Sequence, residues 1–411
     1  MTTAVPAVPA GWRKIPLGDL VRIGHGYAFK GQYFTENGTD AVVTPGNFQE
    51  SGGFREVGAK QKFYAAPYPA LYNLAPGDLI VAMTEQTAGL LGCAAFVPES
   101  GRWLHNQRIG KVSLTSNEVT LAYLFHVFNS ESFRVSVSKT AAGTKVQHTS
   151  PEKLQEIDIL LPPSPEQATI SEAIGDADTQ ITAIERFIAK KIAIMQGVMQ
   201  QLLTGRTRLA GFAAPWQPRK IEKLLLPRVD RYTGGDPLEV LSCTKHQGFV
   251  RSLDYFKNQV FSRNLAGYRI IRRGDIGYPA NHVEEGSIGV QEAYDAALVS
   301  PIYVVMQPFG EIDTYFLQRQ LKLDYFRQEF ARVTNSSVNR RGSLRWEQFS
   351  QIEVLVPDVK EQRAVSRCLR DGEAELHVLQ RRLAKAKAER QGMMQQLLTG
   401  RTRLPLREAT S

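Results

Sequence analysis

Four short polar segments of this sequence contain side chains that form hydrogen bonds with anions and with the edges of heteroaromatic rings. The segment 337–346 places asparagine and arginine around a glycine, and the segment 143–153 carries lysine, glutamine and histidine. Two further segments, 83–89 and 278–286, follow apolar runs that begin with Gly-Asp. The candidate contact residues in the four segments are Thr84, Gln86, Lys145, Gln147, His148, Asn281, His282, Asn339, Arg340, Arg341 and Arg345.

These residue types predict contacts with nucleic acid. Arginine pairs with guanine, asparagine or glutamine pairs with adenine, and lysine or threonine binds phosphate. The net charge of +9 and the pI near 9.4 also favour a polyanionic partner. Many basic proteins bind no nucleic acid, and the alternative for any single residue is a solvated polar loop. The elements that position these segments therefore decide whether the side chains can act together.

The chain contains two copies of one unit. The sequence QGVMQQLLTGRTRL at 196–209 returns as QGMMQQLLTGRTRL at 391–404, with one difference in fourteen positions. The similarity extends upstream, where residues 156–171 align with residues 351–366 at the same spacing. The front parts of the copies share little beyond Trp12 and Trp216 and the Gly-Asp runs. Two divergent fronts attached to two nearly identical tails indicate one frame that carries two different recognition surfaces.

Each tail is predicted to be a long helix with a heptad repeat of apolar residues. Ile170, Ile174, Ala177, Ile181, Ile184 and Ile188 recur at intervals of three and four, and a second series runs from Val365 to Leu397. Gly205 and Gly400 end the two helices. Two series of equal length favour an antiparallel coiled coil over two helices that each pack only on their own domain.

Four arginines follow the helices at equivalent positions of the two copies. Because they recur, they belong to a shared function and not to the recognition of different sequences. They could complement the helix dipole, contact phosphate or bind a partner protein, and we favour the last two. These residues are Arg206, Arg208, Arg401 and Arg403.

The predicted fold is mixed α/β, with an internal pseudo-two-fold repeat in which two globular domains are separated by two long antiparallel helices. The expected order is a flexible N-terminus (1–11), a first globular domain (12–162), a first long helix (163–205), a linker (206–215), a second globular domain (216–357), a second long helix (358–400) and a tail (401–411). Short strands are expected in both globular domains, with one helical region in each, at 121–137 and 312–333.

Other functional classes find little support in the sequence. No apolar run approaches the roughly 20 residues that span a bilayer, and the N-terminus does not resemble a signal peptide, so we expect a cytoplasmic protein. Cys93, Cys243 and Cys368 lie far apart, which predicts packed thiols without a metal site or disulfide. The chain lacks a phosphate-binding loop, a zinc-binding HExxH helix and an amino-methyltransferase motif.

The helix boundaries resemble those of a known family. A proline-led Glu-Gln pair begins each helix, at Pro162, Glu166 and Gln167 and again at Pro357, Glu361 and Gln362, and QQLLTG ends each helix. Two variable domains with such helices resemble the specificity subunit of type I restriction-modification enzymes, and the resemblance covers nearly the whole chain.

The resemblance implies a non-catalytic subunit that recognises a split double-stranded DNA sequence. Residues 12–162 and 216–357 would be target-recognition domains, one for each half of the target. The expected partners are two methyltransferase subunits and the restriction (translocase) subunits, which would carry S-adenosylmethionine and ATP with Mg²⁺. No cofactor or metal is expected in this chain itself. A coiled-coil adaptor that binds only proteins is the alternative, and an enzyme of unrecognised type is a third possibility.

Overall fold

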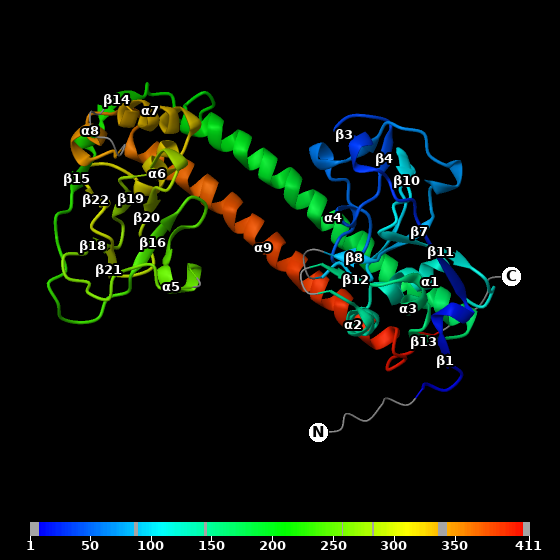
Figure 1. Ribbon diagram of the computed structural model, residues 1–411. Helices are drawn as coiled ribbons and strands as arrows, with labels where there is room; N and C mark the ends of the chain where they lie inside the picture. Colours follow the sequence, from blue (N-terminus) through cyan, green and yellow to red (C-terminus); the bar gives the residue numbers. More distant parts are fainter. Residues whose placement is uncertain are drawn as a thin grey trace. The chain divides into compact units, whose positions relative to one another are not determined.

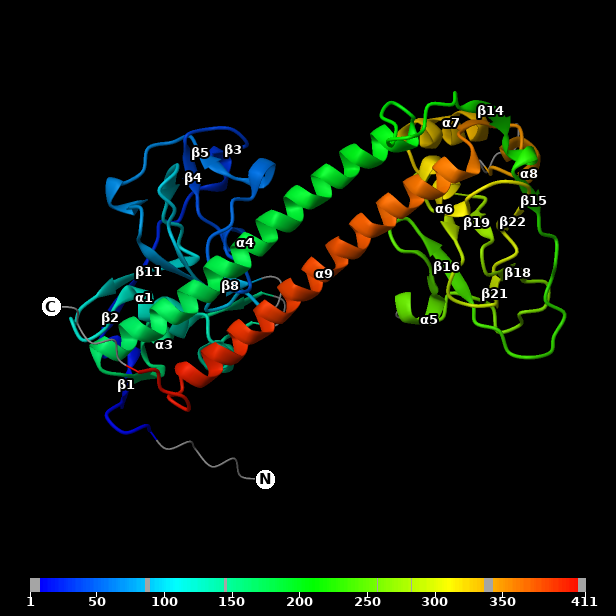
Figure 2. The ribbon, with the colours of Figure 1, turned by 180° about the vertical axis from the view of Figure 1, so that it is seen from behind.

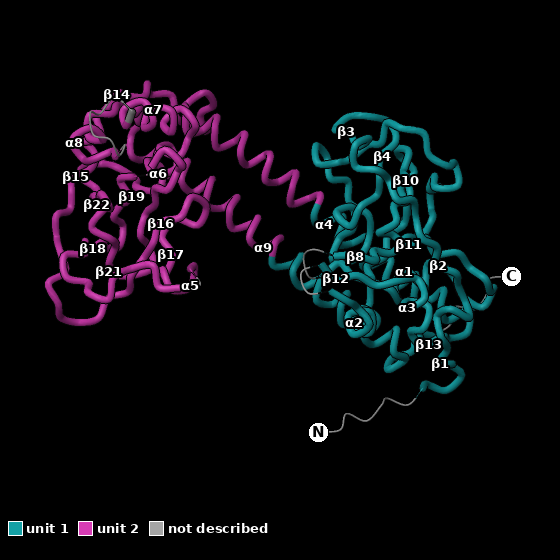
Figure 3. The backbone as a smooth tube through the Cα atoms, viewed as in Figure 1, with its two compact units in different colours: residues 1–185, 381–411 teal, residues 186–380 magenta. Residues whose placement is uncertain are grey.

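The computed structural model describes residues 8–85, 89–143, 146–256, 258–281, 283–335 and 343–405. The chain divides into two compact units, coloured separately in Figure 3. Unit 1 consists of Met1–Glu185 together with Arg381–Ser411, and unit 2 is the continuous segment Arg186–Gln380. Unit 1 is therefore built from both ends of the chain.

Two long helices contribute to both units. Helix α4 spans Ser164–Leu203 and helix α9 spans Val359–Leu397, so each is about 60 Å long at 1.5 Å per residue. In unit 1, Arg390 of α9 pairs with Asp178 of α4 at 2.7 Å, and Lys387 pairs with Glu185 at 2.6 Å. In unit 2, Lys191 pairs with Glu375. Within unit 1 the α4 numbers rise as the α9 numbers fall, so the two helices pair there in an antiparallel direction (Figures 1 and 2).

The frame of unit 1 consists of an antiparallel strand pair, a four-stranded antiparallel sheet and three helices. The pair joins β1 (Arg13–Pro16) to β13 (Asp158–Leu161). The sheet has the order β2 (Val21–His25), β11 (Ile109–Leu114), β7 (Leu79–Ala82) and β9 (Ala94–Phe96). The helices are α1 (Leu121–Phe128), α2 (Glu131–Thr140) and α3 (Pro151–Gln155).

Unit 2 repeats this frame element by element. Its strand pair joins β14 (Gln217–Lys220) to β23 (Glu353–Val356). Its sheet has the order β15 (Leu225–Pro227), β22 (Tyr303–Pro308), β19 (Ile276–Pro279) and β20 (Gly289–Val290). Its helices are α6 (Thr314–Leu321), α7 (Asp324–Asn335) and α8 (Trp346–Phe349). Two sequences that have diverged at most positions therefore build the same arrangement of strands and helices.

The additions to the frame differ between the units. Unit 1 adds a five-stranded sheet in the order β3 (Phe34–Thr35), β5 (Phe63–Tyr64), β4 (Asp40–Val42), β10 (Arg102–Leu104) and β6 (Asn73–Leu74). It also adds the pair of β8 (Thr84–Glu85) and β12 (Gln147–His148). Unit 2 instead adds the pairs β16 (Leu241–Thr244) with β17 (Gly248–Arg251) and β18 (Arg269–Arg272) with β21 (Ala296–Val299), and the short helix α5 (Ser252–Tyr255).

The ends of the long helices belong to the hydrophobic cores of the units. In unit 1, Ile170 and Ile174 of α4 and Leu397 of α9 pack in one cluster with the buried Tyr123 and Phe128. In unit 2, the cluster around Phe316 and Phe349 includes Leu203 of α4 and Leu369 of α9. Burial of these apolar side chains holds each frame against the helices.

The two predicted helical regions are helical, and each consists of two separate helices. In unit 1 the chain breaks at Asn129, and the Ser130 hydroxyl accepts a hydrogen bond from Phe133 N, which caps α2 as a separate helix. In unit 2 the break falls at Lys322 and Leu323, between α6 and α7. An apolar periodicity that continues across a tight corner hides the break from the sequence.

Some predictions of absent sites and buried thiols can also be compared with the structure. None of the described helices is both long and apolar enough to cross a membrane. Within the described ranges, no cluster of three or more histidine, cysteine or acidic side chains could hold a metal ion. Cys93 and Cys243 are buried, as predicted for packed thiols, but Cys368 is exposed on α9, so that prediction was wrong for Cys368.

Candidate nucleic-acid interface

In unit 1 the structure brings two of the predicted polar segments together. Strand β8 pairs with β12, which places Thr84 opposite His148 and Glu85 opposite Gln147. One residue outward on each side, the backbone N–H of Thr149 donates to the Met83 carbonyl at 2.9 Å. His148 is exposed, and Thr84 and Gln147 are half-buried. Segments about sixty residues apart in the sequence thus form one surface that carries a hydroxyl, an amide and an imidazole.

Unit 2 brings its two segments together at the equivalent place. The backbone N–H of Leu344 donates to the Ala280 carbonyl at 2.8 Å, which corresponds to the Thr149 to Met83 bond of unit 1. Asn281 follows Ala280 and is half-buried, and Arg345 follows Leu344 and is exposed. The amide of Asn281 therefore takes the place of the Thr84 hydroxyl, and the guanidinium of Arg345 takes the place of Ser150, which follows Thr149.

Gln86, Lys145, His282, Asn339, Arg340 and Arg341 lie outside the described residues.

A buried carboxylate fixes the chain next to the unit 1 surface. Glu85 is 7% exposed, and its Oε2 atom accepts hydrogen bonds from the backbone N–H groups of Gly89, Leu90 and Leu91 at 2.9, 2.7 and 2.8 Å. Three such donors stabilise a carboxylate strongly. Glu85 therefore holds this segment in place, a role that the sequence did not indicate because a glutamate in a polar loop looks like a solvated residue.

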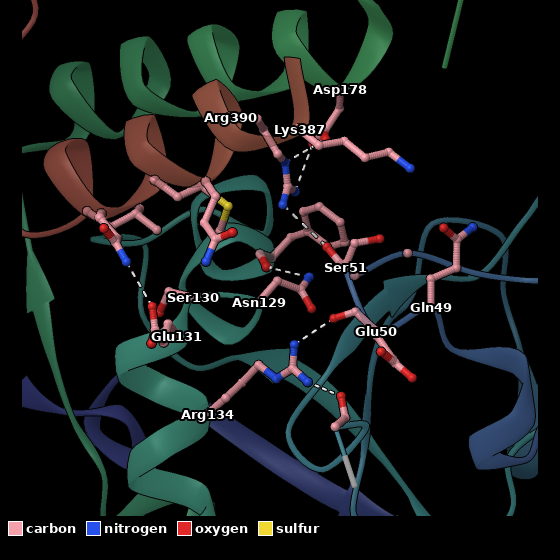
Figure 4. A pocket seen from close by; sticks show the side chains of 18 of the residues that line it. Gln49, Glu50, Ser51, Asn129, Ser130, Glu131, Arg134, Asp178, Lys387 and Arg390 are labelled. Atoms are coloured by element: carbon pink, nitrogen blue, oxygen red, sulfur yellow. Dashed lines mark hydrogen bonds and ion pairs between the residues drawn. The ribbon is translucent and has the colours of Figure 1, made fainter. Parts of the chain in front are cut away.

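A groove with a cavity volume of about 1200 Å³ lies beside this surface within unit 1. It is lined by residues 49–54, by α2 and by facing turns of α4 and α9 (Figure 4). Arg390 crosses it, pairing with Asp178 and donating to the Ser51 carbonyl at 3.4 Å. Its charged lining is mixed, with Glu50, Glu131 and Asp178 beside Arg134 and Arg390, so its charge alone favours no anionic ligand.

Two of the four recurring arginines have partners inside the chain. Arg208 forms a two-pronged ion pair with Glu361, with Nε to Oε1 and Nη2 to Oε2 distances of 2.5 Å, and Arg403 pairs with Glu166 in the same way at 2.9 and 2.8 Å. The two glutamates are 1% and 3% exposed. Each copy's tail arginine therefore neutralises the carboxylate that begins the other copy's helix.

This pairing explains why Arg208 and Arg403 occur in both copies. The explanation requires neither a partner protein nor a phosphate. The hydrogen bond to Glu361 raises the pKa of Arg208 above its ordinary value, and Glu166 does the same for Arg403. Arg206 and Arg401 are exposed, so contacts with phosphate or a partner stay a prediction for these two.

The glutamines of the proline-led pairs also have a structural role. The Gln167 side-chain amide donates to the Pro162 carbonyl at 3.0 Å, and Gln362 donates to the Pro357 carbonyl at 2.8 Å. Their side-chain oxygens accept from Thr120 N and Asp313 N, ahead of α1 and α6. Each glutamine thus fastens a long helix to its own unit, which accounts for a motif that the sequence presented only as a family likeness.

Comparison with known proteins finds similarity to one family. Residues 9–193 match the family model of the type I restriction modification DNA specificity domain. The MjaVIII type I restriction enzyme specificity subunit of Methanocaldococcus jannaschii is 26% identical over 205 residues, which cover 49% of this chain and 48% of that protein. The chain therefore matches about half the length of this curated relative.

Solved structures support the fold along the whole chain. A type I restriction-modification S subunit from M. genitalium has a TM-score of 0.57 and 14% identity, covering 96% of this chain and 98% of that one. A chain from a structure on complex assembly and conformational transition of the type I R-M system has a TM-score of 0.61 and 15% identity, covering 97% and 100%. These comparisons confirm the predicted resemblance to specificity subunits and the predicted fold class.

Proposed function

We propose that this chain is the DNA sequence-recognition subunit of a type I restriction-modification system. Residues 12–162 recognise one half of a bipartite double-stranded target and residues 216–357 recognise the other half. One observation carries the proposal: the two units share a frame and join the same two segments at the same place, but they present different polar side chains there. Two equivalent surfaces with different chemistry suit a target with two different halves.

The catalytic steps belong to other subunits in this proposal. The chain docks two methyltransferase subunits, which bind S-adenosylmethionine, and through them the restriction subunits, which use ATP and Mg²⁺. Two partner copies fit a chain that presents nearly identical helix ends twice, with Arg206 and Arg401 exposed at equivalent positions. The net charge of +9 favours association with DNA, and we expect the protein to act in the cytoplasm, where the chromosome lies.

Methylome sequencing of the host, with and without the gene, tests this proposal. We expect one bipartite methylated sequence to disappear when the gene is deleted and to return when it is restored. An unchanged methylome would contradict the proposal.

A binding experiment separates DNA recognition from a protein-only adaptor. The full chain, assembled with its methyltransferase subunits, should bind a duplex with the bipartite sequence in a salt-dependent manner. Only a competitor duplex with both correct halves should displace it efficiently. Equal competition by unrelated duplexes, or no binding at any salt concentration, would favour the adaptor.

A further inference from the structure

An arginine in unit 1 holds the backbone at Gly89, which lies further along the chain from the candidate DNA-contacting residue Thr84. Arg134 is the fourth residue of α2, and its Nη2 atom donates to the Gly89 carbonyl while Nη1 donates to the Glu50 carbonyl at 2.6 Å (Figure 4). Gly89 has a φ of +114° and donates its own N–H to Glu85. Arg134 and Glu85 therefore fix the two sides of one peptide backbone.

In unit 2 the equivalent arginine holds one backbone carbonyl, and its Nη1 atom pairs with Asp324 at 2.9 Å. Arg327 is the fourth residue of α7, and its Nε atom donates to the Glu284 carbonyl at 3.2 Å. Glu284 lies in the 3-10 helix η7 (Val283–Glu285), which follows the candidate residue Asn281. A Cβ atom built on Gly286, at φ +93°, would lie 3.9 Å from Arg327 Cδ, and one built on Gly89 would lie 3.9 Å from Arg134 Nη2. The two arginines thus occupy equivalent places although the segments that they hold differ in sequence.

A short sequence pattern accompanies the arginine in both copies. An acidic residue begins each helix, and phenylalanine and arginine occupy its third and fourth positions. Phe133 and Phe326 are 4% and 5% exposed, so each anchors its helix in the core of its unit. Because the neighbouring phenylalanine is buried, the backbone from which the arginine side chain extends is fixed. The rigid fork of N–H donors of an arginine suits the carbonyls of a turn.

We propose that Arg134 and Arg327 are positioning residues for DNA recognition, each for the half of the target that its own unit contacts. They fix the backbone beside Thr84 and Asn281, respectively, and determine which bases the side chains of that surface can reach. This inference rests on the proposed function of the chain. The contacts that define it are backbone carbonyls of the same unit, so it requires no contact between the arginines and DNA.

The test compares discrimination at the two halves of the target. Arg134→Gln and Arg327→Gln are each made in the full chain and assembled with the methyltransferase subunits. The probes are duplexes with the bipartite sequence from the methylome experiment and with one base pair changed in one half. We expect Arg134→Gln to reduce discrimination at the first half by about tenfold, the size of one lost base contact, and to leave the second half unchanged. Arg327→Gln should give the opposite result.

Two matched variants control for charge and for helix stability. Arg332→Gln removes an arginine from α7 whose side chain is 70% exposed and pairs with Glu329 one turn earlier, and it should change neither half. Arg134→Lys keeps the charge but loses the fork, so it should behave like Arg134→Gln. Should a glutamine variant fail to fold, as judged by its melting curve, the lysine variant at that position carries the test.

Several outcomes would overturn the inference. A weaker affinity for all duplexes, with a salt slope reduced by about 0.9, would mean that the arginine contacts a phosphate directly. Full recovery in Arg134→Lys would assign the effect to charge, and equal losses at both halves would assign it to general stability. Unchanged discrimination in folded variants would refute positioning. If the unmodified complex binds the altered duplexes as well as the correct bipartite duplex, the proposed function itself fails, and not only this inference.

Discussion

Unit 1 and unit 2 have the same frame but different surroundings. The sheet orders β2-β11-β7-β9 and β15-β22-β19-β20 are equivalent, whereas the five-stranded sheet of unit 1 has no counterpart among the described strands of unit 2. The frame tolerates divergence because its positions require only apolar side chains of suitable size. The tails tolerate little because Arg208, Arg403 and their glutamates form specific pairs, in which a change in one member leaves a buried charge unpaired.

Equivalent positions also differ in their polar chemistry. Trp12 donates its indole N–H to Glu166 at 3.0 Å, but among the described residues the buried indole nitrogen of Trp216 has no hydrogen-bond partner. The sixth residue of α1 is His126, which is buried, whereas the sixth residue of α6 is Arg319. Unit 1 therefore contains a titratable group where unit 2 contains a permanent charge, and the comparison can be tested by experiment.

The largest expected effect comes from exchanging one unit's globular domain. Replacing residues 12–162 with the corresponding region of a relative should change one half of the methylated target completely and leave the other half intact, because each unit has its own frame and core. Methylome sequencing of cells that carry the hybrid gene measures both halves at once. A change in both halves of the target would show that the two units do not recognise DNA separately.

A proline inside either long helix should prevent assembly with the methyltransferase subunits. Ile188 of α4 is buried and Leu383 of α9 is half-buried. Proline at either position should cost at least about 3 kcal/mol of helix stability. Native mass spectrometry measures the loss of the complex, and alanine at the same positions separates loss of the side chain from loss of the helix. A complex that keeps two methyltransferase subunits with either proline would show that the helices are not the shared support.

Acid should destabilise unit 1 through His126. Burial lowers the pKa of His126 to about 4, whereas an exposed histidine titrates near 6.5. Between pH 6.5 and pH 4 the unfolded chain therefore binds a proton at His126 that the folded chain does not bind. The free energy of unfolding consequently decreases as pH falls from 6.5 towards 4. At pH 5 the loss relative to pH 7 is about 2 kcal/mol.

Hydrogen exchange, corrected for the intrinsic effect of pH on the rate, can localise this loss. Peptides from α1 should lose protection between pH 7 and pH 5, and His126→Gln should remove most of that change. Peptides from α6, which contains no histidine, should change less. Equal losses in both helices, or no effect of His126→Gln, would contradict the assignment.

The smallest expected difference is between the two tryptophans. Trp12→Phe and Trp216→Phe remove the same atoms, but only Trp12 loses a described hydrogen bond to a carboxylate. Trp12→Phe should therefore destabilise its unit by about 1.5 kcal/mol more than Trp216→Phe destabilises the other. Urea titration followed by hydrogen exchange of β1 and β14 peptides checks this, and equal costs would mean that the bond to Glu166 adds nothing.

The sequence predicts those parts of the fold that depend on local patterns. The heptad repeat and Gly205 and Gly400 place α4 and α9 within a few residues of their observed bounds, because periodicity and helix-ending glycines act over short distances. The pairing of β8 with β12 is different: these two-residue strands lie about sixty residues apart and have no pattern of their own. Their adjacency follows from the fold of the whole unit.

The candidate site divides in the same way. Residue types indicated four polar segments, and the structure joins them in pairs at Thr84 with His148 and at Ala280 with Leu344. For the repeated arginines the sequence favours contact with phosphate or a partner protein, because a recurring charge shows that a role is shared but not what the side chain contacts. Glu361 lies 153 residues from Arg208, so only the folded chain reveals the pair.

The division of unit 1 between the two ends of the chain affects the order of events during synthesis. Glu166 leaves the ribosome 237 residues before Arg403, which at about 5–20 residues per second is a delay of tens of seconds at the slower rates. During that interval the core around Ile170 also lacks Met394, Leu397 and Leu398. Unit 2, which is continuous, can finish folding while unit 1 still exposes an apolar face and an unpaired carboxylate. The domain that is translated first is thus completed last, and loss of the final thirty residues or so would damage the N-terminal domain and spare the one that precedes the cut.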